Sequence, residues 1–409
     1  MSEAASTTAF KPLAGTTLFS PLQIGAVKLE HRIVQAPCTR MRGELESEGI
    51  WAPGDIMVEY YAQRASKGGL LLTEATNISR LCSGYPGVAG VFTPGQIAAW
   101  KRVTDAVHAK GGFIFCQIWH VGRATVPSLI EGNTTMSSSD IPITGKALTG
   151  AEYSDTPPKP MTVDQIKGVV SDFADAAKKC VEAGFDGVEI HGANGYLLDQ
   201  FLHDNVNTRT DEYGGSIEKR CRFPLEVIKA VTAAIGPEKV GIRLSPYNYY
   251  QDTRDSNPNV HWAYLCQQIA ELPTENRVAY VHMIEPRFDE ILSEQEKIAN
   301  LAKTTGDATS KEVSAVNSLV PFRHILAKGG VKFLAAGNYN RDNAEGALVA
   351  DNADAIVMGR LFISNPDLPK RLAEGLPLNA YDRSTFYGAD PPTKGYTDYS
   401  FYEPTAVAT

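Results

Sequence analysis

The chain has 409 residues, of which 43% are hydrophobic and 21% are charged, and its net charge is −8. These values are ordinary for a soluble globular protein. Proteins that bind a polyphosphate backbone usually carry a strong basic excess, so the acidic balance argues against nucleic acid as a partner.

Eight short apolar runs recur along the chain, with helix-like amphipathic segments between most of them. Strands that alternate with helices predict parallel pairing, and nearly continuous apolar strands predict burial on both faces. Eight such units favour an α/β fold of the closed (β/α)8 type, a TIM barrel, over an open doubly wound sheet. The predicted strands are 32–37, 69–74, 113–118, 187–191, 240–245, 279–284, 332–336 and 355–358. The predicted helices are 55–66, 94–109, 163–182, 217–234, 261–271, 314–328 and 341–350.

Two segments depart from a minimal barrel. After an N-terminus (1–17) that we expect to be flexible, residues 18–30 predict a hairpin that turns at Gly25. Segment 123–161 is rich in Ser, Thr, Pro and Gly and follows the third strand, on the face where barrels assemble their active sites. We interpret it as a lid or substrate-facing insertion, with a surface loop without function as the alternative. The whole chain, 1–409, is predicted to form a single domain with a C-terminal tail over 388–409.

The cellular compartment is predicted from what the sequence lacks. The six cysteines are scattered without a C-x-x-C pair, which favours free thiols in a reducing compartment. The N-terminal stretch lacks the layout of a secretion signal, and no run approaches the roughly 18 apolar residues of a membrane span. We therefore expect a cytoplasmic protein with no membrane segment.

Polar residues and glycines follow the predicted strands. The carboxyl ends of barrel strands share one face, so these residues should lie together. Each alone is more often a partner within the fold than a ligand. They are Thr39, Glu74, Ala75, Gln117, Trp119, His191, Asn194, Arg243, Gly337, Asn338, Gly359 and Arg360.

The last two strand ends predict a phosphate site. Gly337-Asn338 follow the seventh strand and Gly359-Arg360 follow the eighth, where barrels commonly bind phosphate. Backbone N–H groups approach closely where glycine lacks a Cβ atom, and arginine adds a forked, charge-assisted contact. The pattern indicates a phosphorylated ligand without identifying it.

The run from His191 to Tyr196 has the most specific chemistry. His191 and Asn194 can both donate to one oxygen, and the hydroxyl of Tyr196 can release a proton. Two donors at an oxygen that gains negative charge, beside a proton source, suit reduction of a polarised double bond. A packed histidine with a capping asparagine is the alternative. Nucleophilic and metal-dependent hydrolysis lack their marks, because the chain has neither G-x-S-x-G nor H-E-x-x-H.

Several long stretches resemble the Old Yellow Enzyme family, fungal or yeast-like branch, whose members are FMN-dependent NAD(P)H ene-reductases. They occur in the family's order over about residues 18–387. They are RIVQAPCTRMR (32–42), VEYYAQRAS (58–66), GGLLLTEAT (68–76), CQIWHVGR (116–123), IHGANGYLLDQFLHDNVNTRTDEYGGSIEKRCRF (190–223), GIRLSPY (241–247), AAGNY (335–339), MGRLFISNPDLP (358–369) and YDRSTFY (381–387).

The resemblance implies a tightly bound, non-covalent FMN. Thr39 would contact the flavin C4 oxygen, Gln117 its N3/O2 edge and Arg243 its N1/O2 edge. The full implied FMN set is Pro37, Thr39, Ala75, Gln117, Arg243, Gly337, Asn338, Gly359 and Arg360.

The resemblance also implies a ping-pong reaction, in which NADPH or NADH reduces the flavin and an activated alkene then takes its place. The alkene is an α,β-unsaturated carbonyl compound or a nitroalkene. His191 and Asn194 would hold its activating oxygen, and Tyr196 would protonate the α carbon. Trp119 and Tyr387 would shape the pocket.

Other features stay open at the level of sequence. Segment 285–301 should form a mobile loop over the pocket, and the chain is expected to be a monomer or a homodimer. The alternatives in function are a flavin-free, phosphate-binding lyase or isomerase, and a flavin-binding barrel whose redox activity is vestigial. The lyase would need a Schiff-base lysine or an acidic pair at the strand ends, and neither is visible.

Overall fold

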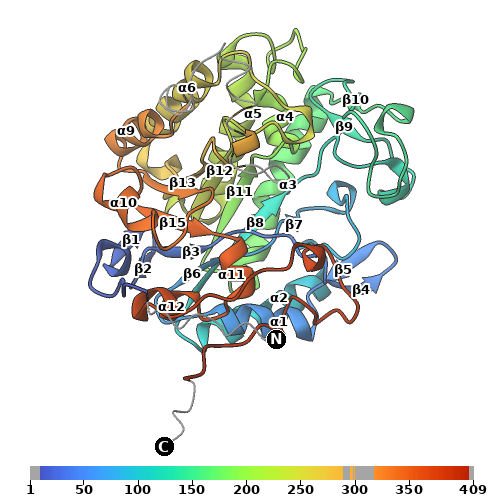
Figure 1. Ribbon diagram of the computed structural model, residues 1–409. Helices are drawn as coiled ribbons and strands as arrows, with labels where there is room; N and C mark the ends of the chain where they lie inside the picture. The colour runs from blue at the N-terminus through green and yellow to red at the C-terminus, as the bar shows by residue number, and fades with distance from the viewer. Residues whose placement is uncertain (1–9, 289–294, 298, 300–316, 405–409) are drawn as a thin grey trace, which may run out of the picture.

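The computed structural model describes residues 10–288, 295–297, 299 and 317–404 (Figure 1). Parallel strands follow one another in the order β11-β12-β13-β14-β15-β3-β6-β8, and β8 pairs again with β11. The sheet therefore closes into an eight-stranded barrel with helices around it, which confirms the predicted TIM barrel. Its strands are β3 (Ile33–Gln35), β6 (Leu70–Leu72), β8 (Phe113–Trp119), β11 (Gly187–Gly192), β12 (Val240–Leu244), β13 (Tyr280–Ile284), β14 (Lys332–Ala336) and β15 (Ala355–Met358).

Each predicted strand lies at its expected place, and its ends differ from the prediction by at most two residues. Side chains alternate between two apolar layers, as barrel strands require. On β8, Ile114, Cys116 and Ile118 belong to the layer beneath the helices, whereas Phe115 belongs to the barrel interior. This alternation explains why every strand reads as a continuous apolar run.

The helices also follow the prediction, with differences at their ends. The α3 helix has the predicted bounds and begins at a capping box formed by Thr162 and Gln165. The α6 helix begins three residues earlier than expected, because Asn257 caps it and Pro258 occupies its first position. The helices are α1 (Asp55–Arg64), α2 (Pro94–His108), α3 (Val163–Glu182), α4 (Leu197–Leu202), α5 (Ile217–Ile235), α6 (Pro258–Glu271), α9 (Val320–Lys328), α10 (Ala344–Val349), α11 (Arg360–Ser364) and α12 (Leu368–Glu374).

The predicted N-terminal hairpin is present as β1 (Leu22–Ile24) and β2 (Val27–Leu29), which pair antiparallel across Gly25. Their apolar side chains join the cluster that fills the barrel interior. The Ala26 N–H donates to the Glu238 carbonyl, 3.0 Å away and just before β12. The hairpin therefore covers the N-terminal end of the barrel.

Several short elements were not predicted. The pair β4 (Glu44–Ser47) and β5 (Ile50–Ala52) forms a surface hairpin, and β7 (Thr76–Asn77) extends the sheet beside β8. Within segment 123–161, β9 (Met136–Ser137) pairs with β10 (Lys159–Pro160). Ile130 and Ile143 of this segment are buried, so part of it packs against the barrel.

Both ends of the described chain are held by hydrogen bonds. The Phe10 N–H donates to Gly375 O and the Leu13 N–H to Leu372 O, each over 3.1 Å. This part of 1–17 therefore differs from the flexible end that we expected; residues 1–9 lie outside the description. In the tail, the ring of Tyr396 stacks on Tyr60 with centroids 4.1 Å apart.

Two predictions fall partly outside the described residues. They are the loop over 285–301 and residues 314–316 of the helix expected over 314–328. Residues 317–319 are described and are not helical, so α9 begins later than predicted, at Val320. Within the described ranges, no helix is both long and apolar enough to cross a membrane.

Candidate active site

Strand register brings the candidate residues of β11 and β12 together. His191 pairs with Arg243, and Arg243 pairs in turn with His282 of β13. Gln117 of β8 pairs with Glu189 of β11. Around the same barrel end, half-buried Thr39 follows buried Pro37 after β3, and buried Ala75 lies between β6 and β7. The residues that follow the strands thus meet on the C-terminal face of the barrel.

His191 is buried and neutral. Its Nδ1 atom accepts the Ala193 N–H over 3.3 Å, so the ring proton belongs on Nε2. Burial, with the nearby positive charge of Arg243, lowers the pKa of His191 well below its ordinary value of 6.5. His191 can therefore donate a hydrogen bond without carrying a charge.

The turn after β11 is held by two buried side chains. Asn194 has φ +58° and Gly195 has φ +74°, a left-handed region that asparagine and glycine tolerate best. The Asn194 N–H donates to Ser245 Oγ over 2.8 Å, and the Gly195 N–H donates to Asp199 Oδ2 over 2.9 Å. These contacts fix Asn194 beside His191.

Tyr196 lies in an aromatic group at the same turn. Its ring centroid is 5.1 Å from that of His191 and 4.8 Å from that of Trp119, and Trp119 in turn lies 5.7 Å from Tyr85. Burial and the neighbouring tyrosines raise the pKa of Tyr196 well above 10. Tyr196 therefore keeps its proton at neutral pH.

The walls of this aromatic group come from distant parts of the chain. The indole N–H of buried Trp119 has no hydrogen-bond partner within the described part of the chain, which fits a pocket that receives a polar ligand or water. Tyr387 contributes to the high pKa of Tyr196 and is itself 69% exposed, so it lies near the opening. Tyr85, which was not predicted, follows no barrel strand and carries no pattern that marks it.

The residues at the ends of β14 and β15 fit a phosphate group. The two strands are neighbours, and Gly337 and Asn338 have φ +119° and +53°. A Cβ atom at Gly359 would lie 3.2 Å from Cys38 Sγ, so glycine keeps this turn close to the end of β3. Arg360 follows directly. The Arg287 side chain, not predicted, donates to Gly337 O over 3.1 Å and adds a second guanidinium.

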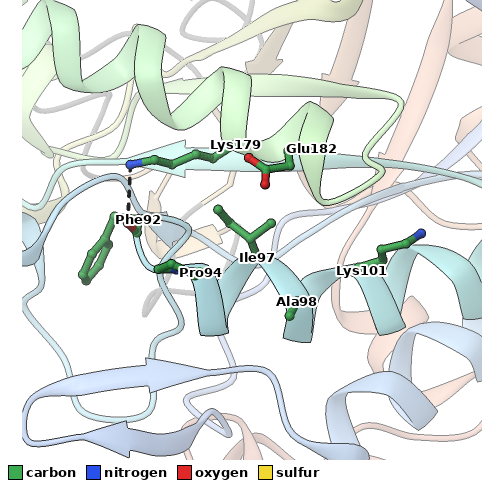
Figure 2. Close-up of a pocket in the computed structure, with 7 residues that line it drawn as sticks. All are labelled: Phe92, Pro94, Ile97, Ala98, Lys101, Lys179 and Glu182. Carbon is green, nitrogen blue, oxygen red and sulfur yellow. Dashed lines mark hydrogen bonds between the residues drawn. The ribbon is translucent and has the colours of Figure 1, made fainter.

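A surface cavity lies away from this face. Figure 2 shows it on the outer side of the barrel wall, between α2 and α3, with a volume of about 440 Å³. Ile97 and Lys101 of α2 line it opposite Lys179 and Glu182 of α3, and none of the predicted site residues takes part. The described residues hold no group of three or more His, Cys, Asp or Glu side chains that could bind a metal.

A TIM barrel whose strand ends carry glycines, arginines and a neutral histidine beside a protonated tyrosine fits the class of flavin-dependent oxidoreductases. The chain belongs to the NADH:flavin oxidoreductase / NADH oxidase family, whose model matches residues 17–379. This confirms the resemblance to Old Yellow Enzymes, and with it FMN as the cofactor and a nicotinamide as the reductant.

Similar proteins cover nearly the whole chain. Flavin oxidoreductase hxnT of Emericella nidulans is 67% identical over 94% of this chain and 97% of its own length. The 12-oxophytodienoate reductase 1 of Oryza sativa subsp. japonica is 45% identical over 95% and 94%. The structure of morphinone reductase in complex with tetrahydroNAD superposes with a TM-score of 0.79, at 38% identity over 95% and 98%. The chain is an FMN-dependent ene-reductase that reduces the C=C bond of unsaturated compounds.

Proposed function

We propose that His191, Asn194 and Tyr196 carry out this reduction on α,β-unsaturated carbonyl compounds or nitroalkenes. His191 and Asn194 donate hydrogen bonds to the activating oxygen, and Tyr196 protonates the α carbon. The observation that carries the proposal is the neutral His191 next to a tyrosine that keeps its proton. Relatives named as 12-oxophytodienoate reductase and morphinone reductase support reduction as the reaction type.

When bound, FMN would supply the hydride chemistry that links NADPH or NADH to the β carbon of the alkene. The residues of this chain stabilise the charge that develops. The Nε2–H of His191 and the side-chain amide of Asn194 hold the oxygen that becomes an enolate, which lowers the barrier. Tyr196 then releases the proton from its hydroxyl to the α carbon. Burial disfavours the tyrosinate, so Tyr196 takes a proton back readily.

We also propose the residues that hold FMN. Pro37, Thr39 and Ala75 would hold the flavin ring together with Gln117 and Arg243. Arg243 is suited to this role because a guanidinium stabilises a ring that gains negative charge. Gly337, Asn338, Gly359 and Arg360 would hold the phosphate.

Anaerobic stopped-flow absorbance in the flavin band tests the reaction. The purified protein is mixed first with NADPH or NADH and then with 2-cyclohexenone. We expect bleaching by the nicotinamide and recovery by the enone, and the faster of the two nicotinamides is the preferred reductant. Bleaching without recovery by any activated alkene would instead support the vestigial barrel.

The remaining assignments are part of the same proposal. We assign the whole chain, 1–409, to one FMN-binding domain in the cytoplasm, with 123–161 and Tyr387 bordering the substrate entrance. The six free cysteines, five of them buried, support a reducing compartment. The protein is a monomer or a homodimer, and light scattering of the purified holoenzyme distinguishes the two.

A further inference from the structure

A buried carboxylate lies in the barrel interior, next to the residues assigned to the flavin ring. Glu189 of β11 is 0% exposed and precedes His191 by two residues on the same strand. An ionised carboxylate in such a place costs several kcal/mol unless hydrogen-bond donors surround it. The structure provides three donors, each from a different position in the barrel wall.

These donors occupy both carboxylate oxygens. Gln117 Nε2 donates to Oε1 over 2.7 Å. Tyr280 Oη and His282 Nδ1 donate to Oε2 over 3.1 Å and 3.0 Å. Glu189 therefore links β8 and β13 through its own strand.

Glu189 is the charged member of this network. Burial alone would raise its pKa, but the contacts with His282 and Gln117 and the charge of Arg243 outweigh it, so the pKa lies below the ordinary value. Burial lowers the pKa of His282, which makes this histidine neutral. The negative charge of Glu189 thus lies near the positive charge of Arg243, which is on the neighbouring strand β12.

The carboxylate also determines how the Gln117 amide is turned. An ionised carboxylate only accepts hydrogen bonds, so it must face the NH₂ group of the amide. The carbonyl oxygen of Gln117 is then directed away from Glu189. A neutral partner at position 189 would allow the amide both orientations.

We propose that Glu189 is a positioning residue for the cofactor. Its hydrogen bond orients the amide of Gln117 toward the flavin edge. Its negative charge, near Arg243, lowers the reduction potential of bound FMN. The proposal rests on the assignment of Gln117 and Arg243 to the flavin ring made above.

The variant Glu189→Gln keeps the size of the side chain and removes its charge. Without that charge, electrons enter the flavin more easily, because a nearby anion disfavours a ring that becomes negative. We expect the reduced-to-oxidised flavin ratio of the holoenzyme, equilibrated with a reference dye, to rise at least tenfold. An unchanged ratio would overturn the electrostatic part of the proposal. Tyr280→Phe, which removes one donor and keeps the charge, serves as control and should stay within twofold.

The variant Glu189→Asp separates orientation from charge and remains informative if Glu189→Gln does not fold. The shorter side chain keeps the negative charge but withdraws it from Gln117. We expect the FMN dissociation constant, measured by ultrafiltration of the holoenzyme, to rise about tenfold while the dye ratio stays within twofold. FMN binding as tight as in the unsubstituted protein would overturn the positioning role. Both readouts need no alkene, so failure of the roles of His191 and Tyr196 would not alter them.

Discussion

The two ends of the barrel interior differ sharply in chemistry, although the same strands build both. Toward the N-terminal end, Leu29 of the hairpin and Phe115 of β8 belong to a cluster of buried hydrophobic residues. Two residues further along β8 comes Gln117, and the interior there holds the Glu189 network. The N-terminal end stabilises the fold by burying apolar area. At the C-terminal end, burying a polar group costs free energy unless the group is hydrogen-bonded. Substitutions at the two ends should therefore change different properties.

The largest effect is expected at the polar end. Tyr196→Phe removes the proton donor and keeps the ring, so alkene reduction should slow by roughly 10²- to 10⁴-fold. Reduction of the flavin by NADPH should stay within twofold, since it needs no proton from Tyr196. Stopped-flow absorbance measures both half-reactions. Tyr213→Phe, which removes a hydroxyl bonded to Glu226, is the matched control and should change neither rate. Equal losses in both half-reactions would contradict the role of Tyr196 as the acid.

The apolar end should respond in stability alone. Leu29 is fully buried in the hydrophobic cluster of the barrel interior. Leu29→Ala leaves a cavity there and should lower the free energy of unfolding by about 2–5 kcal/mol. The flavin spectrum and turnover of the folded fraction should not change. Denaturant unfolding measures the loss, with Leu45→Ala, 58% exposed, as the control. A changed turnover of the folded protein would contradict the prediction that substitutions at the apolar end alter stability without altering activity.

A smaller effect at the polar end tests the grip on the substrate oxygen. His191→Ala removes one of two donors, so phenolic ligands should bind about 10- to 100-fold more weakly. Titration of a phenol against the flavin absorbance gives the dissociation constant. His108→Ala, which removes a hydrogen bond to Asp186 on the outer surface, should leave it unchanged. Unaltered phenol binding in His191→Ala would refute the assignment.

Much of the fold could be predicted because its signals are local. The apolar runs that predicted every barrel strand each lie within one element. Helix caps such as Thr162 are equally local. The elements that were missed are short or solvent-exposed. All four residues of β4 are exposed, so the strand has no apolar alternation to reveal it, and the six-residue α4 is too short for a helical period.

The candidate site could be predicted where residues follow strands, and the rest could not because its contacts join distant positions. Gln117 and Glu189 are 72 residues apart, and Glu189 and His282 are 93 apart. In a one-dimensional sequence, Glu189 is only a charged residue inside an apolar strand. That mismatch with its surroundings was the available signal. Tyr85 and Arg287 offered no comparable sign.

The smallest effect concerns Glu74, another buried carboxyl at the polar end. Burial raises its pKa from 4.5 to about 7, although its Oε2 accepts the Arg40 N–H. The folded chain therefore keeps a proton that the unfolded chain releases between these two values. Stability must fall as the pH rises through this window and then stay level above it.

Glu74→Gln removes the titrating group, so the variant should gain about 1–3 kcal/mol over the unsubstituted protein at pH 8 and nothing at pH 4.5. Denaturant unfolding at a series of pH values measures the difference between the two proteins. Because only the difference is read, other titrating groups cancel. A difference between the two proteins that is the same at pH 4.5 and pH 8 would contradict the raised pKa of Glu74, because the stability difference changes with pH only where the folded and unfolded chains bind protons differently.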